Sequence, residues 1–269
     1  MNALTGIQIR WVIAGLICIL FNYCFRALRL NVLTNRKLKV WPQGLYCTST
    51  HGFVTYMLPL RSGDLSLPLL LKSIANMNLK EGATVLYKAR LLELSTLGIW
   101  LVAAALVSFP KLPPAVIITL ILSGILMVLT PFLIQRLFDR SFLPFEKLQR
   151  VVKNLTKANK MNFREIMLTW GIWLSIALSI WCITAAMQLH LSIVDIVLLI
   201  ALQLVMQFIP VQGFANSGNH ESGWVAALVL VGHPLDIAVK FALTSHAILL
   251  LYVLLLGLIA LILRYVFIR

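Results

Sequence analysis

Five apolar stretches, each long enough to cross a bilayer, constrain this sequence more than any other feature. They lie at residues 11–30, 86–108, 114–135, 166–187 and 241–263. A helix needs about 20 mostly apolar residues to cross the hydrocarbon core of a membrane. Inside lipid every backbone polar group must find its partner within the chain, which favours helices for segments of this length. The sequence therefore predicts an all-α polytopic membrane protein.

Composition supports this class and argues against a nucleic-acid-binding protein. Hydrophobic residues make up 60% of the 269 residues and charged residues 12%, whereas soluble domains are roughly half apolar and a quarter charged. The net charge of +14 comes from basic residues in short segments between the apolar stretches, where they set orientation and meet anionic headgroups. We therefore expect membrane lipid, and not nucleic acid, as the partner. The four cysteines show no metal-ligand spacing, so no metal, cofactor or disulfide framework is predicted.

An additional apolar region at 44–77 is interrupted by helix-breaking and charged residues. Pro59 and Gly63 stand on either side of Arg61, and Asp64 follows directly. Proline removes a backbone donor and glycine relaxes the backbone, so we expect two half-helices that meet at a charged break. The region is then a re-entrant helical hairpin. A cytoplasmic loop carrying a surface ion pair is the alternative.

A second interrupted region lies at 193–233. Its apolar sequence is broken by a turn at 210–224 that is rich in Gly and Asn. Such a turn ends one helical stretch and allows another to start. The sequence therefore predicts a second re-entrant hairpin.

The basic residues predict the orientation of the chain. Of the 23 Lys and Arg residues, five lie within 26–39, four within 72–90, eight within 136–164 and two within 264–269. By the positive-inside rule these segments face the cytoplasm, with the N-terminus outside and the C-terminus inside. The two hairpins then enter from opposite faces, at corresponding positions of two halves, which is typical of an inverted-repeat transporter.

The whole chain, 1–269, is predicted to form a single membrane domain. Its first half is 1–135 and its second half is 166–269. The segment 136–165 joins the halves, and its apolar residues recur at helical spacing among lysines. We expect an amphipathic helix on the cytoplasmic membrane surface.

The charged and polar residues near the breaks form the candidate substrate site. They are Arg61 and Asp64 at the first break, Asn219, His220 and Glu221 at the second, and Arg90 and Glu93 near the start of a predicted span. An ionised side chain in hydrocarbon costs about 2.5–3.5 kcal/mol, so such residues usually pair, and we expect Arg61 to pair with Asp64. Arg90 and Glu93 can pair along one helix face, although an ordinary pair at the membrane interface would explain them equally well. Four other histidines are scattered singly and are predicted to be ordinary polar residues: His51, His190, His233 and His246.

Several short motifs, taken together, resemble a known family. They are Arg26-Ala27-Leu28-Arg29, Leu58-Pro59-Leu60-Arg61-Ser62-Gly63-Asp64, Arg90-Leu91-Leu92-Glu93, the turn from Pro210 to Glu221, and Gly232. In this order and spacing they are similar to the flippase-like family that includes the transmembrane region of lysylphosphatidylglycerol synthase. By this resemblance Arg61 matches the family arginine, Asp64 stands where glutamate is usual, and Glu221 matches the acid after the glycine-rich turn. The first motif adds Arg29 to the candidate substrate-binding residues.

The resemblance implies a multi-pass protein of a prokaryotic cytoplasmic membrane that moves a polar-headed lipid across the bilayer. The expected cargo is an anionic phospholipid or an isoprenoid-phosphate-linked intermediate, because an arginine and helix N-termini at the breaks suit a phosphate. Two alternatives stay open. One is a membrane-embedded transferase that acts on a lipid carrier, with Asp64 or Glu221 as base. The other is a non-transporting partner of a glycosyltransferase or lipid-modifying enzyme. No catalytic residue is assigned, because no nucleophile and base occur at a recognisable spacing.

The predicted orientation can be tested by labelling from each side of the membrane. A cysteine at Lys157 should react only with a reagent added on the cytoplasmic side, because it lies in the most basic segment. A cysteine at Ser192 should react only from the outside. Labelling of both positions from one side would contradict the inverted-repeat interpretation.

Overall fold

The computed structural model describes residues 6–109, 112–139, 162–189, 191–208 and 213–268, and the secondary structure of these residues is helical. The α-helices are α1 Ile9–Leu33, α2 Leu45–Met57, α3 Ser66–Ala75, α4 Leu79–Val107, α5 Pro114–Asp139, α7 Phe163–Ala186, α8 Ile193–Phe208, α9 Asn219–Leu230 and α10 Leu235–Phe267. Three short helical turns accompany them: η1 Val40–Gly44, η2 Pro59–Leu65 and η3 Phe214–Asn216. The predicted all-α class is confirmed.

Five helices are long and apolar enough to cross a membrane, and they correspond to the five predicted stretches: α1, α4, α5, α7 and α10. Some begin earlier than their apolar sequence does, because polar residues cap the first turn. In α4 the Asn78 side chain accepts the backbone N–H of Glu81 at 2.8 Å, and the Glu81 carboxylate accepts the N–H of Asn78 at 3.1 Å. This capping box starts α4 at Leu79, seven residues before the predicted span at 86.

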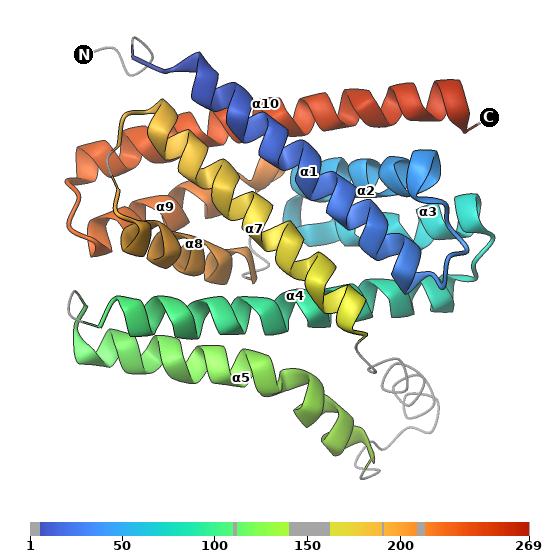
Figure 1. Cartoon of the computed structure of the whole chain (residues 1–269), viewed down its shortest axis with the longest axis horizontal. Coiled ribbons are helices and arrows are strands. Elements are labelled where there is room, and N and C mark those ends of the chain that lie inside the picture. Colours follow the sequence, from blue (N-terminus) through green and yellow to red (C-terminus); the bar gives the residue numbers. More distant parts are fainter. Residues whose placement is uncertain (1–5, 110–111, 140–161, 190, 209–212, 269) are drawn as a thin grey trace.

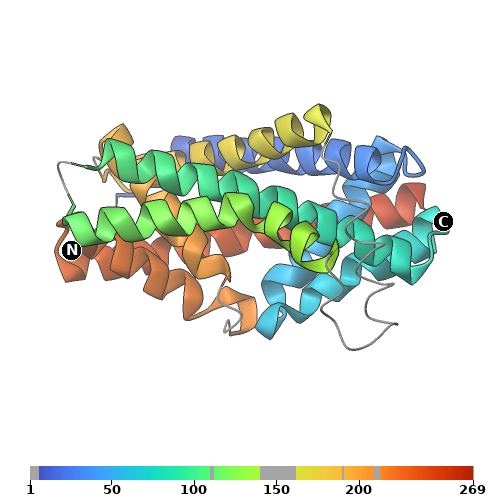
Figure 2. The same cartoon turned by 90° about the horizontal axis from the view of Figure 1, so that it is seen from below.

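Helices α4 and α10 run along the long axis of the molecule, α5 lies beside α4, and α1 and α7 cross this direction obliquely (Figure 1). Helix α1 packs along α7, α4 along α5, and α10 along α9 and α2. Figure 2 shows α4 and α5 on one side of the bundle, with α10 on the other side.

The two interrupted regions form a helix, a break and a second helix, as predicted. In the first, η2 separates α2 from α3; in the second, η3 lies between α8 and α9. The α2/α3 pair lies at the end of the molecule that holds the C-terminus, and α8 and α9 lie toward the opposite end (Figure 1). The two breaks contact each other, because η3 packs against α2 and η2. Re-entry from opposite membrane faces and the inverted repeat stay predictions.

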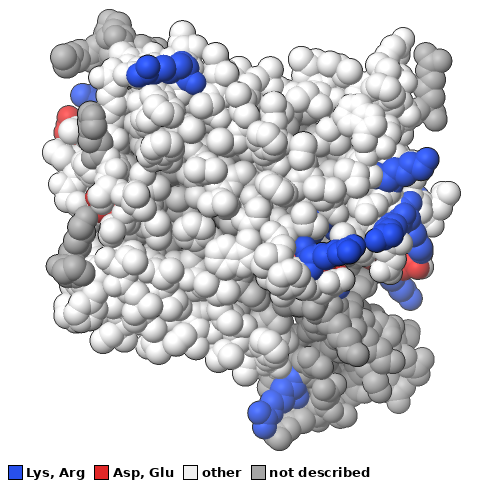
Figure 3. Space-filling view, viewed as in Figure 1, with Lys and Arg blue, Asp and Glu red and all other residues white. Residues whose placement is uncertain are grey.

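Charged side chains lie away from the middle of one face of the molecule. On the face shown in Figure 3, the Lys and Arg side chains gather mainly toward the end that holds the C-terminus, and the broad middle of that face carries no charge. An uncharged band between polar ends is what a lipid-embedded protein requires. The predicted amphipathic helix at 136–165 falls mostly on residues 140–161, outside the described residues.

Helices α4 and α5 approach closely at two glycines. A Cβ added to Gly98 would lie 2.5 Å from the Gly124 carbonyl oxygen, and a Cβ added to Gly124 would lie 2.6 Å from the Gly98 carbonyl oxygen. Small residues of this kind allow backbone contact between helices where lipid provides no hydrophobic driving force.

We predict that Gly98→Leu separates α4 from α5 and lowers the free energy of unfolding by about 1–3 kcal/mol, as expected for overpacking. Ala103→Leu is the matched control, since Ala103 lies on the same helix and is exposed. Thermal unfolding in detergent measures both variants. Equal stability of the two would show that the glycine contact is dispensable.

Candidate functional site

The first break, η2, has an unusual backbone. Leu60 and Arg61 each have a φ of 54°, a left-handed conformation that is costly for residues with a Cβ. Gly63 lies directly against α2, because a Cβ added there would be 2.4 Å from Thr55 Cα. Glycine is therefore needed at position 63, and the break is folded back onto the end of α2.

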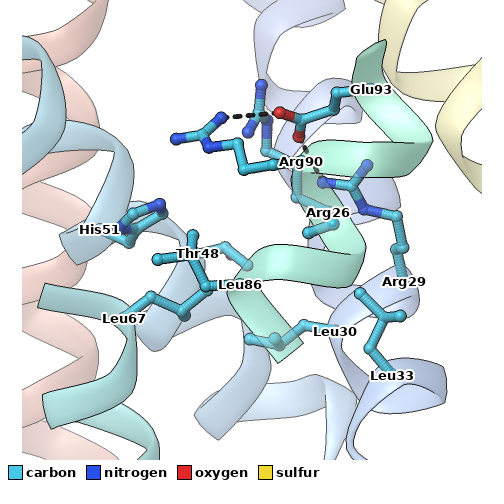
Figure 4. A pocket seen from close by; sticks show the side chains of 11 residues that line it. Arg26, Arg29, Leu30, Leu33, Thr48, His51, Leu67, Leu86, Arg90 and Glu93 are labelled. Carbon is cyan, nitrogen blue, oxygen red and sulfur yellow. Dashed lines mark hydrogen bonds and ion pairs between the residues drawn. The ribbon is translucent and has the colours of Figure 1, made fainter. Parts of the chain in front are cut away.

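A chain of alternating charges runs from α1 to the first break. Arg29 Nη2 on α1 lies 2.6 Å from Glu93 Oε1 on α4. The other oxygen of Glu93 lies 2.6 Å from Arg90 Nη1, and Arg90 also forms an ion pair with Asp64. Figure 4 shows Arg29 and Arg90 approaching Glu93 from two sides. These contacts tie together α1, α4 and η2.

The charge chain, formed by Arg29, Glu93, Arg90 and Asp64, consists of four predicted site residues. One of its pairings differs from the prediction. We expected Asp64 to pair with Arg61, whereas Asp64 pairs with Arg90. The positive φ of Leu60 and Arg61 means that a spacing of three residues does not put positions 61 and 64 on one helix face. The predicted Arg90–Glu93 pair is present, and because Glu93 also binds Arg29 it is more than an intrahelical surface pair.

The second break repeats the local backbone of the first. Ala215 and Asn216 have φ values of 53° and 60°, and they follow an extended residue and one helical residue, as Leu60 and Arg61 do. A serine comes next in both breaks. Two consecutive left-handed residues without glycine are rare, so both breaks hold conformational strain at the point where they meet.

Side chains at the start of α9 close the second break. Glu221 Oε2 accepts the backbone N–H of Gly218 at 2.8 Å, and Glu221 Oε1 contacts His246 Nδ1 of α10. His220 Nε2 lies 3.1 Å from Ser245 Oγ. Asn219 is buried beside them at the first position of α9. The three predicted residues of this break are thus adjacent, and two of them, His220 and Glu221, contact α10.

A cavity of about 240 Å³ lies between the two breaks. Three arginines line it, from α1, η2 and α4, together with polar side chains from α8, η3 and α9: Arg26, Arg61, Arg90, Gln203, Asn216 and His220. A smaller cavity of about 30 Å³ adjoins it and is lined by Arg29 and Glu93 (Figure 4). Of the predicted site residues, Arg61, Arg90 and His220 therefore face the larger cavity.

Some cavity residues were missed by the sequence analysis. Arg26 lines both cavities, and only its place in the first family motif could have indicated this. Tyr56 and Gln203 are isolated polar residues in apolar helices and gave no signal. His246, predicted to be an ordinary polar residue, instead pairs with Glu221.

Four buried polar atoms of cavity residues have no hydrogen-bond partner among the described residues: Tyr56 Oη, Arg90 Nε, Gln203 Oε1 and Trp224 Nε1. A buried unpaired polar group costs about 1–3 kcal/mol. The three arginines that line the larger cavity favour a polar occupant. Within the described part of the chain, no group of three or more His, Cys, Asp or Glu side chains could hold a metal ion.

We predict that Arg90→Gln destabilises the protein by about 1–3 kcal/mol, because it leaves the half-buried Asp64 carboxylate without its ion-pair partner and removes one of the two partners of the buried Glu93. Arg10→Gln is the control: it removes an exposed arginine near the start of α1, and it should be clearly milder. Thermal unfolding in detergent compares the two. Equal losses for the two variants would show that the ion pairs of Arg90 are dispensable for stability.

Comparison with known proteins gave one family. The family model described as the lysylphosphatidylglycerol synthase TM region matches residues 1–257. No curated protein and no solved structure matched the chain. The match covers the charge chain, both breaks and the five long helices almost to their end. The chain therefore belongs to the family of the lysylphosphatidylglycerol synthase transmembrane region, a family of flippase-like membrane proteins.

Proposed function

We propose that the protein moves an anionic polar-headed lipid across the membrane, with the headgroup passing through the cavity between the two breaks. The cargo is an anionic phospholipid or an isoprenoid-phosphate-linked intermediate of envelope or glycan synthesis. The observation that carries this proposal is the group of arginines at that cavity.

The charge balance around the first break supports an anionic headgroup. The four arginines Arg26, Arg29, Arg61 and Arg90 line the two cavities. Glu93 lines the smaller cavity, and Asp64 pairs with Arg90. Four positive charges and two negative charges leave an excess of two positive charges in a low-dielectric setting. A phosphate would neutralise that excess and could take bidentate hydrogen bonds from a guanidinium group.

The size of the cavity also bears on its occupant. A cavity of about 240 Å³ is smaller than a typical site for a drug-sized ligand. It suits a headgroup, while the acyl or isoprenoid chains would stay in the surrounding lipid.

The position of Arg26 gives a route for the headgroup. Arg26 lines both the larger and the smaller cavity, and its Nε donates to Asn22 Oδ1 at 2.8 Å. A phosphate that passes from one cavity to the other could therefore stay in contact with an arginine side chain throughout.

In the proposed orientation the N-terminus is outside a prokaryotic cytoplasmic membrane and the C-terminus is inside. A glycosyltransferase or lipid-modifying enzyme would make or consume the lipid.

Reconstitution into vesicles with headgroup-labelled lipids tests the proposal. The protein should move a phosphate-bearing lipid faster than a lipid with an uncharged headgroup. Arg61→Lys should slow this movement roughly tenfold, because lysine lacks the planar fork that binds a phosphate with two hydrogen bonds. Arg10→Lys is the matched control, since Arg10 is exposed and near the start of α1. Equal handling of both lipids, with no effect of Arg61→Lys, would contradict the proposal.

A further inference from the structure

His246 of α10 stands between two hydrogen-bond acceptors at the second break. Its Nδ1 faces the Glu221 carboxylate, and its Nε2 lies 2.8 Å from the Ala215 carbonyl oxygen. A neutral imidazole carries one N–H, so it can donate to only one of these acceptors. A neutral histidine beside a carboxylate can therefore make only one of the two hydrogen bonds. An additional proton, on the imidazole or on the carboxylate, is needed to make both.

The surroundings of Glu221 place that proton on the histidine. Glu221 Oε2 already accepts the backbone N–H of Gly218 at 2.8 Å, and Glu221 lies in the first turn of α9. Both the N–H donor and the positive end of the helix dipole stabilise a carboxylate over a carboxylic acid. The arrangement therefore corresponds to an imidazolium that donates to Glu221 and to Ala215.

We propose that Glu221 and His246 form a proton-binding site. The bound proton keeps the turn at Ala215 and Asn216 in the conformation seen here, and its release allows that turn to change conformation. The assignment goes beyond the transport of a lipid, because it concerns what changes the conformation of the protein. It does not depend on which lipid is moved.

The link from proton to break is the hydrogen bond to Ala215. Ala215 and Asn216 are held at φ values of 53° and 60°, and the histidine Nε2–H is the donor to the Ala215 carbonyl in this turn. Loss of the proton leaves one acceptor of His246 without a donor, and the strained turn can then relax. Because Asn216 lines the cavity, relaxation changes the cavity wall.

Other titratable groups face His246 from the packed elements. From α9, the His220 ring lies 4.8 Å away between centroids, in addition to Glu221. From α2, the Tyr56 ring lies 6.2 Å away. From η2, Arg61 lines the same cavity as His220.

Nuclear magnetic resonance of ¹⁵N-histidine in the full-length protein tests the proton directly. The chain has five histidines, and His246→Gln identifies the signal of His246 by difference. We expect both ring nitrogens of His246 to be protonated at neutral pH, and Glu221→Gln to convert the ring to the neutral form. A neutral His246 ring in the unmodified protein at neutral pH would overturn the proposal.

Cysteine labelling tests the link to the break. In a variant without the four native cysteines, Cys18, Cys24, Cys47 and Cys182, a single cysteine is placed at Asn216. Thr55→Cys is the matched control, because Thr55 lines the same cavity from α2. We expect the labelling rate at position 216, relative to position 55, to rise roughly tenfold on raising the pH, the scale of one lost hydrogen bond to a charged group.

Two further variants identify the titrating group. Adding His246→Gln should abolish the pH dependence of the labelling ratio, whereas His233→Gln, at the turn before α10, should leave it unchanged. A ratio that does not vary with pH, or one that still varies without His246, would overturn the proposal. Neither assay uses lipid transport, so a failure to move lipid in vesicles would count against the proposed function alone.

Discussion

The ion pairing of the half-buried Arg90 is the interaction on which the rest of the site depends. A guanidinium group inside an apolar bundle needs carboxylate partners, and Arg90 takes them from its own helix, at Glu93, and from the first break, at Asp64. Because Glu93 also binds Arg29 of α1, removal of Glu93 leaves Arg29 without its ion-pair partner, and removal of Arg90 does the same to Asp64. This mutual dependence fixes the position of η2 relative to α1 and α4, and with it the position of Arg61 at the cavity.

The two breaks show how this helical membrane protein holds irregular backbone between packed helices. Each has two consecutive left-handed residues, Leu60 and Arg61 in one and Ala215 and Asn216 in the other. Side chains support them: Arg90 holds Asp64 at the first, and His246 binds the Ala215 carbonyl at the second. In a membrane protein, irregular backbone is tolerated where it is enclosed by protein or faces a cavity. The cavity therefore lies where the two strained turns meet.

Much of the fold could be predicted because a bilayer requires each spanning helix to be a continuous apolar stretch, which is visible in the local sequence. The five spans follow from the length of their apolar runs, and Pro59 with Gly63 indicated the break between α2 and α3. The boundaries were less certain, since α4 begins at Leu79 through the capping box of Asn78 and Glu81. The family was visible in the arginine and acid motifs, and the match over residues 1–257 confirms it.

By itself the sequence determined the membrane class, the five spans, the two interrupted regions and most of the charged residues that matter. Only the tertiary structure decided which charges meet. Asp64 pairs with Arg90 and not with Arg61, and His246 joins Glu221, because residues distant in the chain are brought together by helix packing and by left-handed turns. Helical periodicity assumes a continuous helix and fails at such turns. Isolated polar residues such as Tyr56 and Gln203 acquire their place at the cavity only when the helices are assembled.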